Sequence, residues 1–254
     1  MRKNAFLLSE LVRRELTARF AGSLGGPLWM ILNPLVYAVI FGYVFSVVLK
    51  TSPPPGFPAG YAEFLLAGLL PWIGVQEAVS RGGAAVLEQG HLVKKLRFPS
   101  ELLVAAAVGT ALLTEAVAVA LLTAYAAASG ADVRPGALAA AFLLQALALA
   151  GPVLLLAALE VYVRDAAQLV APALMILFYL TPIVYPETMV PAGLRPWLQL
   201  NPLKDIVALF RAGIFGSPWP DAVHLAGWSA FFLVLAFAAR KVFRRASRSF
   251  ADLL

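Results

Sequence analysis

The sequence predicts an all-α integral membrane protein with six transmembrane helices, and three observations support this fold class. First, 61% of the 254 residues are hydrophobic and only 13% are charged, which is too little charge to cover the surface of a soluble domain of this size. Second, apolar segments of about 20 residues, the length that crosses a bilayer core, recur along the chain. Third, turn-forming sequences separate these segments. We therefore treat residues 1–254 as one transmembrane domain.

The first element is an amphipathic segment at residues 4–21. Its polar face carries Arg13 and Arg14, and Glu15 precedes Arg19 by four residues, the favourable order for an ion pair within a helix. A basic amphipathic helix followed by a glycine-rich turn predicts a helix lying on the cytoplasmic membrane surface. A solvated helix without a partner is the alternative. The apolar arc of this helix comprises Leu7, Leu8, Leu11, Val12, Leu16 and Phe20.

Six apolar segments follow, and we interpret each as a membrane span. Several contain proline, which membrane helices tolerate because neighbouring helices can satisfy the freed carbonyl groups. The expected bounds are 28–49, 61–80, 102–128, 137–163, 166–185 and 223–243.

Lysine and arginine gather on one side of these spans. Fifteen of the 20 lie in the amino-terminal segment, the loop after the second span, the 163–165 turn and the carboxyl-terminal tail, against five elsewhere. Because basic residues are enriched in cytoplasmic loops, this bias predicts that both termini are cytoplasmic. That orientation requires an even number of spans, and six satisfies it.

The most basic loop, expected at 82–99, contains the sequence GHLVKKLRFP from Gly90. Anchoring by positive charge explains the lysines and the arginine but not the apolar residues between them. A role in binding nucleic acid would need an exposed soluble tail, and spans on both sides argue against it. We interpret the loop as a compact element, broken at Gly90, that docks on a cytoplasmic partner. Membrane anchoring alone is the alternative.

The segment between residues 186 and 220, on the outer side, is more apolar than an aqueous loop. It contains two helix-like pieces, 194–200 and 203–213, separated by Asn201-Pro202. Each piece is too short to cross a bilayer, so re-entrant or interfacial helices are predicted. A folded outer loop is the alternative.

Catalytic and metal-binding patterns are sparse. There is no cysteine, and neither His91 nor His224 belongs to a metal-binding motif that combines a glutamate with a second histidine, such as H-E-x-x-H. Nucleotide-binding and hydrolase motifs are also missing from the sequence. Glu115 lies well inside the third span, where we expect a polar contact between helices, with a carboxylate on a substrate path as the alternative. The sequence therefore predicts a conduit without enzymatic activity and without a bound metal.

Four segments, taken in order, resemble a known family. They are RRELTARFAGSLGGPLWMILNP, EQGHLVKKLRFPSELL, VYVRDAAQLV and TPIVYPETMVPAGLRPWLQLNPLKDIVALFRAGIFG. Together they are similar to the surface helix, coupling loop, cytoplasmic turn and outer gate of membrane subunits from type-2 ABC exporters. This family moves lipid-linked polysaccharides in O-antigen, teichoic acid and capsule export, and the resemblance covers nearly the whole chain.

The resemblance implies a homodimeric permease in the bacterial cytoplasmic (inner) membrane, docked on a separate ATP-binding cassette subunit. ATP and Mg would bind to that partner, and this chain would hold no cofactor. Arg164 and Asp165 would form a structural pair in the cytoplasmic turn. The implied coupling residues are Glu88, His91, Leu92, Lys94, Lys95, Phe98 and Pro99. The implied outer-gate residues are Pro182, Trp197, Asn201 and Pro202.

Aromatic side chains would link this architecture to a sugar substrate, because flat pyranose faces stack on aromatic rings. Ordinary interfacial belts and helix packing are the alternative explanation for the same residues. The substrate's anionic headgroup would meet Arg13, Arg14 or Arg19 at the cytoplasmic surface. The candidate pore-lining aromatics are Trp29, Tyr37, Phe41, Tyr43, Phe45, Phe64, Trp72, Phe178, Tyr179 and Tyr185.

Two other functions compete with export of a lipid-linked polysaccharide. The first is a drug or small-lipid efflux permease of the same fold. The second is an integral membrane transferase acting on polyprenyl lipids. A transferase predicts clustered intramembrane acids or a metal motif, whereas the acids of this sequence are scattered.

Overall fold

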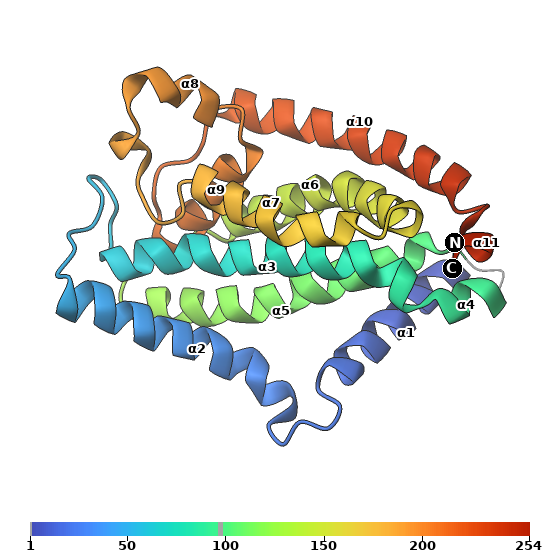
Figure 1. Cartoon of the computed structure of the whole chain (residues 1–254). Helices are drawn as coiled ribbons and strands as arrows, with labels where there is room; N and C mark the ends of the chain where they lie inside the picture. The colour runs from blue at the N-terminus through green and yellow to red at the C-terminus, as the bar shows by residue number, and fades with distance from the viewer. Residues whose placement is uncertain (1, 96–98) are drawn as a thin grey trace.

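The computed structural model describes residues 2–95 and 99–254, and every regular element in these residues is a helix (Figure 1). The longer helices are α1 (Arg2–Arg19), α2 (Trp29–Gly42), α3 (Tyr61–Glu88), α5 (Glu101–Ala128), α6 (Pro135–Tyr162), α7 (Ala166–Leu180), α9 (Pro202–Phe215) and α10 (Ala222–Ala246). The short ones are η1 (Gly26–Leu28), η2 (Tyr43–Val48), α4 (Gly90–Lys95), η3 (Glu187–Met189), η4 (Ala192–Leu194), α8 (Arg195–Leu198) and α11 (Phe250–Leu253).

Within the described residues, five helices are long and apolar enough to cross a membrane. They are α3, α5, α6, α10 and the continuous stretch Gly26–Val48 that contains α2. The remaining apolar helix, α7, has 15 residues, which rise only about 22 Å against the roughly 30 Å of a bilayer core. A count of six spans therefore remains a prediction that depends on α7.

The fifth predicted span was expected to reach residue 185, but α7 ends at Leu180. Thr181 adopts an extended backbone (φ −98°, ψ 133°), because the proline that follows it disfavours the helical region for the preceding residue. Pro182 also lacks the N–H that would continue the helix. The proline therefore ends this helix earlier than the hydrophobic run suggests.

The second span was expected to end at residue 80, yet α3 continues to Glu88. Gly82 and Gly83, the first two residues of the loop expected at 82–99, lie inside this helix and are buried. A Cβ atom at Gly83 would lie 2.9 Å from Cδ2 of Leu156 on α6. These glycines thus permit close approach of two helices and do not mark a turn, so the coupling loop begins only at Gln89.

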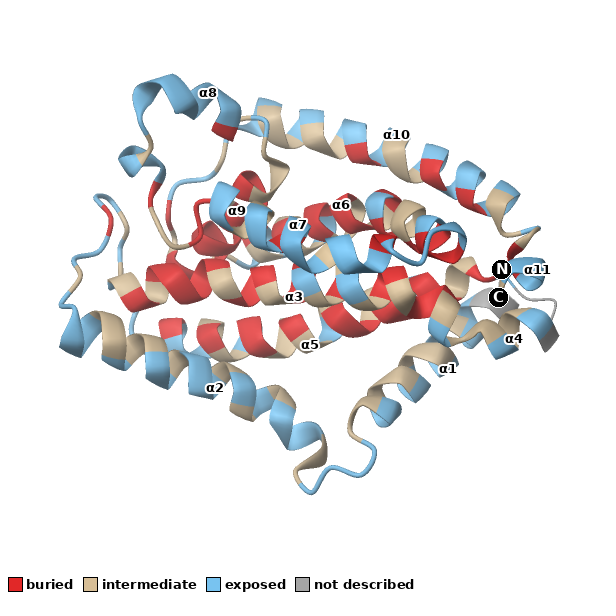
Figure 2. Ribbon diagram, viewed as in Figure 1, coloured by how far each residue is buried: buried red, intermediate tan, exposed pale blue. Residues whose placement is uncertain are grey.

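The core is formed around α3, which packs against α5, α6, α9, α2 and α7. Sixteen residues of α3 are buried, whereas α2 contains none. Figure 2 shows this contrast, with buried residues concentrated on α3, α5, α6 and α9 and exposed residues along α2, α7 and α10. The inner helices are thus packed like a soluble core, and the outer ones present apolar surface.

The segment expected to hold two re-entrant helices contains one substantial helix. That helix, α9, has 14 residues and is largely buried. The earlier piece, expected at 194–200, is reduced to η4 and the single turn α8, and its Leu194, Trp197 and Leu200 are exposed. Figure 1 places α8 and α9 toward one end of the molecule and α4, α11 and both termini at the other.

Candidate functional site

An aromatic groove of about 530 Å³ lies between α2, α3 and α7. Trp72 packs against Phe178 with ring centroids 5.5 Å apart, and Phe178 lies 5.2 Å from Tyr179 in an edge-to-face arrangement. On α2, the rings of Tyr37 and Phe41 stack at 6.2 Å. The structure thus brings together five of the aromatics singled out in the sequence. The groove-lining set is Tyr37, Phe41, Trp72, Phe178 and Tyr179.

The other candidate aromatics lie away from this groove. Tyr43 is exposed on η2, and Tyr185 donates its hydroxyl to the Tyr179 carbonyl at 2.7 Å. Phe45 packs on Tyr61 with centroids 4.9 Å apart. Phe64 is buried in the core, and the Arg211 guanidinium covers its ring at 3.5 Å, so the expectation that it lines a pore is wrong.

A smaller cavity of about 240 Å³ lies beside the aromatic groove, between α1, α2, α3 and α5. Tyr37 and Ile73 line both spaces. Trp29 also borders the smaller cavity, and its indole N–H donates to Ser23 Oγ at 3.0 Å. The polar groups that line this cavity come from Arg19, Asn33, Glu77, Thr114 and Glu115. An aromatic surface and a chamber lined partly by polar groups therefore meet beside Tyr37 of α2.

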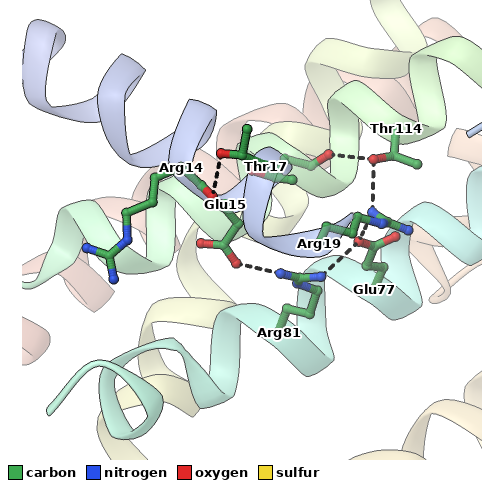
Figure 3. A network of polar contacts seen from close by, with 8 residues as sticks. Arg14, Glu15, Thr17, Arg19, Glu77, Arg81 and Thr114 are labelled. Atoms are coloured by element: carbon green, nitrogen blue, oxygen red, sulfur yellow. Dashed lines mark hydrogen bonds and ion pairs between the residues drawn. The ribbon is translucent and has the colours of Figure 1, made fainter. Parts of the chain in front are cut away.

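Charged residues bordering this chamber join α1 to the bundle, as Figure 3 shows. Arg19 forms an ion pair with Glu77 of α3 and donates to Thr114 Oγ1 of α5 at 3.0 Å. Arg81 of α3 donates to Glu15 Oε1 at 2.7 Å. The expected pairing of Glu15 with Arg19 inside α1 is therefore replaced by two bridges to α3. The sequence offered no signal for this exchange, because it depends on where α1 docks.

The three arginines proposed for headgroup contact are in different environments. Arg13 is exposed over 78% of its side chain, with Glu10 as a distant partner at 3.9 Å, and Arg14 is also exposed. Arg19 is exposed over only 23% and is already paired with Glu77. Leu11, on the apolar arc, packs against a small cluster of α3 and α5. The helix thus rests on the bundle while its outward face keeps two arginines available.

Glu115 is buried and accepts a hydrogen bond from Gln145 Nε2 on α6 at 2.5 Å. This confirms the expected polar contact between helices. Gly74 allows the contact, because the Glu115 carboxyl occupies the space where a Cβ would stand. Within the described residues, the second carboxyl oxygen of Glu115 has no hydrogen-bond partner.

The predicted coupling residues spread over three elements. Glu88 ends α3 and is exposed, whereas α4 exposes His91 and Lys94 and turns Leu92 toward Ala85, Leu103 and Ala107. Lys95 ends α4, Pro99 is exposed ahead of α5, and Phe98 lies outside the described residues.

In the turn between α6 and α7, Arg164 and Asp165 are both exposed. Among the ion pairs of the described residues, none joins these two side chains. The pair expected in this turn is therefore not formed.

Three of the four outer-gate residues meet at the junction of α7 and α9. Asn201 donates to Thr181 Oγ1 at 2.9 Å and accepts from the Leu203 N–H at 3.0 Å. Pro202 begins α9, and Pro182, directly after Thr181, is buried and accepts a hydrogen bond from Arg211 of α9 through its carbonyl. Trp197, the fourth residue, is 71% exposed on α8.

Arg211 on α9 is a residue that the sequence did not single out. Its guanidinium donates to the carbonyls of Pro182 and Ile183 at 2.9 Å each and to that of Phe64 at 3.2 Å. These bonds tie α9 to α3 and to the end of α7. The available signal was an arginine inside the apolar run VALFRAGIF, where a charge needs buried partners.

Comparison with known proteins is consistent with this arrangement. A family model described as ABC-2 type transporter matches residues 7–215. An O-antigen export system permease protein of Myxococcus xanthus is 32% identical over 250 residues, which cover 97% of this chain and 94% of that protein. A Klebsiella pneumoniae protein with the same designation is 25% identical over 261 residues, covering 98% and 95% of the two chains. The similarity thus extends over nearly the full length of both proteins.

Proposed function

The chain belongs to the ABC-2 type transporter family, and from this premise we propose that it is the channel-forming permease subunit of an ATP-driven polysaccharide exporter. The proposed substrate is a lipid-linked polysaccharide such as O-antigen or teichoic acid, moved across the bacterial cytoplasmic membrane. ATP and Mg²⁺ are proposed to bind to a separate partner subunit that docks at α4. The relatives named as O-antigen export permeases support the substrate class.

The observation that carries this proposal is the adjacency of the aromatic groove and the polar chamber. A lipid-linked glycan combines an anionic pyrophosphate with sugar rings and an apolar tail. Aromatic rings provide a sugar-stacking surface that does not require one deep binding site, and the chamber beside them supplies polar groups. A small hydrophobic drug would need neither a polar chamber nor an extended aromatic surface.

The proposed assembly is a homodimer with six spans per copy and cytoplasmic termini. No residue of α2 is buried, and Tyr37 and Tyr179 are exposed on the wall of the groove. A second copy facing this groove would enclose it as a conduit. In this arrangement α7 is the fifth span in chain order and brings the total to six, with the 181–186 segment completing its passage toward the outer face.

Headgroup capture is proposed for Arg13 and Arg14 on the exposed face of α1. Both are free to reach an anion at the membrane surface, whereas Arg19 is held by Glu77. Lipid phosphates are strong acceptors for guanidinium groups. The interface helix would thus receive the headgroup while the groove receives the sugars.

The test is reconstitution of the permease with its partner ATPase in liposomes. Three compounds are compared: a polyprenyl-pyrophosphate glycan, the same lipid without glycan, and a cationic drug. For each compound, ATP hydrolysis and movement of the compound across the bilayer are measured. The proposal predicts that only the glycan-bearing lipid both stimulates hydrolysis and crosses. Stimulation by the drug alone would overturn it in favour of a drug efflux permease.

Groove variants refine the test. The double variant Tyr37→Ala with Tyr179→Ala is expected to lower export roughly thirtyfold, because each of the two rings contributes stacking of about 1 kcal/mol. Tyr37→Phe with Tyr179→Phe keeps both rings and should export nearly normally. Phe237→Ala, an exposed aromatic on α10, is the matched control outside the groove. Equal export by all three variants would remove the groove from the path.

A further inference from the structure

The residues after α10 fold back onto the proposed coupling helix. Figure 1 shows α11 beside α4 at the end of the molecule that holds both termini, and the two helices are in contact. They come from positions about 160 residues apart in the chain. Sequence patterns gave no role to this carboxyl-terminal stretch beyond its positive charge.

A buried aromatic residue anchors α11 to the bundle. Phe250 is 0% exposed and packs edge-to-face against Phe243 of α10, with ring centroids 5.5 Å apart. On its other side lies Tyr162 of α6 at 6.1 Å. The Tyr162 hydroxyl also lies 2.6 Å from Ser249 Oγ. Aromatic packing and a hydrogen bond together hold α11 to the ends of α6 and α10.

From this anchor, the next residues reach α4. The Leu254 side chain lies over Gly90, so that a Cβ at Gly90 would be 3.5 Å from the Leu254 Cβ. Leu92 and Val93 of α4 pack against Ala85 and Leu103. The coupling helix is therefore held between the bundle and α11.

A helix of six residues needs this support. Isolated helices shorter than about 12 residues are marginal in water, so their orientation comes from packing. A helix that transmits movement must also be firmly attached at both faces, because a loose one would absorb the displacement. In α4 the packing comes from residues of α3 and α5 and from Leu254.

We propose that α11 is a positioning element for α4, with Phe250 as its anchor and Leu254 as its contact. It sets the orientation of the coupling helix and thereby the amount of export obtained per ATP hydrolysed. This inference rests on the proposed function, since it assumes that a partner ATPase acts through α4. It adds a positioning role for a segment to which neither sequence motifs nor the comparisons assign one.

The first test compares Phe250→Ala with Leu253→Ala, a neighbour whose side chain is partly exposed on the same helix. Phe250→Ala is expected to leave ATP hydrolysis in place while export per ATP falls roughly two- to thirtyfold, the range for residues that carry coupling. Phe250→Leu, which keeps an apolar anchor, should recover most of the export per ATP of the native protein, and Leu253→Ala should leave export per ATP unchanged. An unchanged ratio in Phe250→Ala would overturn the proposal.

The second test uses a disulfide, since the chain has no native cysteine. Gly90→Cys with Leu254→Cys places two Cβ atoms about 3.5 Å apart, within the range for a disulfide. When the cysteine pair is oxidised in the Phe250→Ala background, export per ATP should be restored, and reduction of the disulfide should lower it again. If Phe250→Ala does not fold, the same pair in the otherwise native chain is used, and the oxidised complex should keep its export.

Failure of the disulfide to form, or loss of export when the native chain is locked, would show that α11 does not brace α4 during the cycle. Failure of the proposed function would appear differently. The native complex itself would then move no glycan, while the disulfide would still form between α11 and α4.

Discussion

The helices α3 and α2 are both apolar spans, yet the structure uses them in opposite ways. Sixteen residues of α3 are buried, including four glycines and several alanines, whereas α2 has no buried residue and presents Leu35, Val39 and Tyr37 outward. Buried glycines and alanines are frequent in α3, whereas α2 exposes large apolar side chains along its length. Small residues let backbones approach, as they do between helices in membranes generally, and large ones cover surface that lipid or another chain will meet.

The contrast between inner and outer helices also separates the contacts that hold the fold together from the residues proposed to serve transport. Inner helices are fixed by close glycine contacts and by the Arg211 clamp. The outer helices hold the aromatic groove and the exposed arginines of α1. Changes in the first group should destabilise the fold, and changes in the second should alter export while the fold survives.

The largest expected effect is at Arg211. Arg211→Met removes the donors to the carbonyls of Pro182 and Ile183, and should lower the free energy of unfolding by roughly 2–4 kcal/mol. Arg195→Met is the matched control, because Arg195 also donates to carbonyls, at 3.0 and 3.2 Å, but from an exposed position. Thermal unfolding in detergent measures both. Equal losses would mean that burial does not distinguish the two arginines.

The next effect is expected where α9 crosses α6. A Cβ at Gly213 would lie 2.8 Å from the backbone nitrogen of Leu138, which cannot move aside. Gly213→Ala should therefore destabilise the protein by roughly 1–3 kcal/mol. At Gly42, on α2, a Cβ would meet nothing within 4 Å, so Gly42→Ala should raise stability by about 0.5 kcal/mol through its helix propensity. Unfolding midpoints of the two variants should thus move in opposite directions.

A smaller effect is expected at the boundary between α1 and the core. In a double-mutant cycle, Arg19→Ala and Glu77→Ala should give a coupling energy of roughly 1–2 kcal/mol, reduced from that of a fully buried pair because Arg19 remains 23% exposed. The Glu10–Arg13 pair, at 3.9 Å and largely exposed, should give at most about 0.5 kcal/mol. Comparable coupling in both cycles would contradict the docking of α1 seen in Figure 3.

The smallest effect on stability is expected on the outer face of α1. Arg13→Gln combined with Arg14→Gln should leave the unfolding midpoint within error, because both side chains are exposed. Export should nevertheless fall severalfold, and the deficit relative to the native protein should shrink at high ionic strength as the headgroup attraction is screened. Unchanged export with normal docking of the ATPase would remove these arginines from headgroup capture.

Predictions from sequence were accurate where the signal was local. Five of the six predicted apolar segments coincide with helices long enough to cross a membrane, and the basic segments before the first span and around α4 marked two elements that form helices. The Asn201-Pro202 boundary was also placed correctly, since Asn201 caps α9. Even the Glu115 contact was foreseen, because a carboxyl in the middle of an apolar helix needs a polar neighbour.

Errors arose where a local pattern had a distant cause. Gly82 and Gly83 were assigned to the loop at 82–99 but lie in α3 and contact α6, and Glu15 and Arg19 matched a pair within one helix but bind α3. The aromatic residues were too numerous for the sequence to choose among them. Only the packing of α2 and α7 beside α3 separated the five of the groove from Phe64 in the core.

Composition and hydrophobic periodicity were thus sufficient to establish a helical membrane protein and its approximate spans, because each residue's preference for lipid or water acts independently of its neighbours. Tertiary structure decided which apolar helices are inside, which charges are paired, and that α11 meets α4. These contacts join residues tens to hundreds of positions apart. They depend on shape and close approach, which no short stretch of sequence specifies alone.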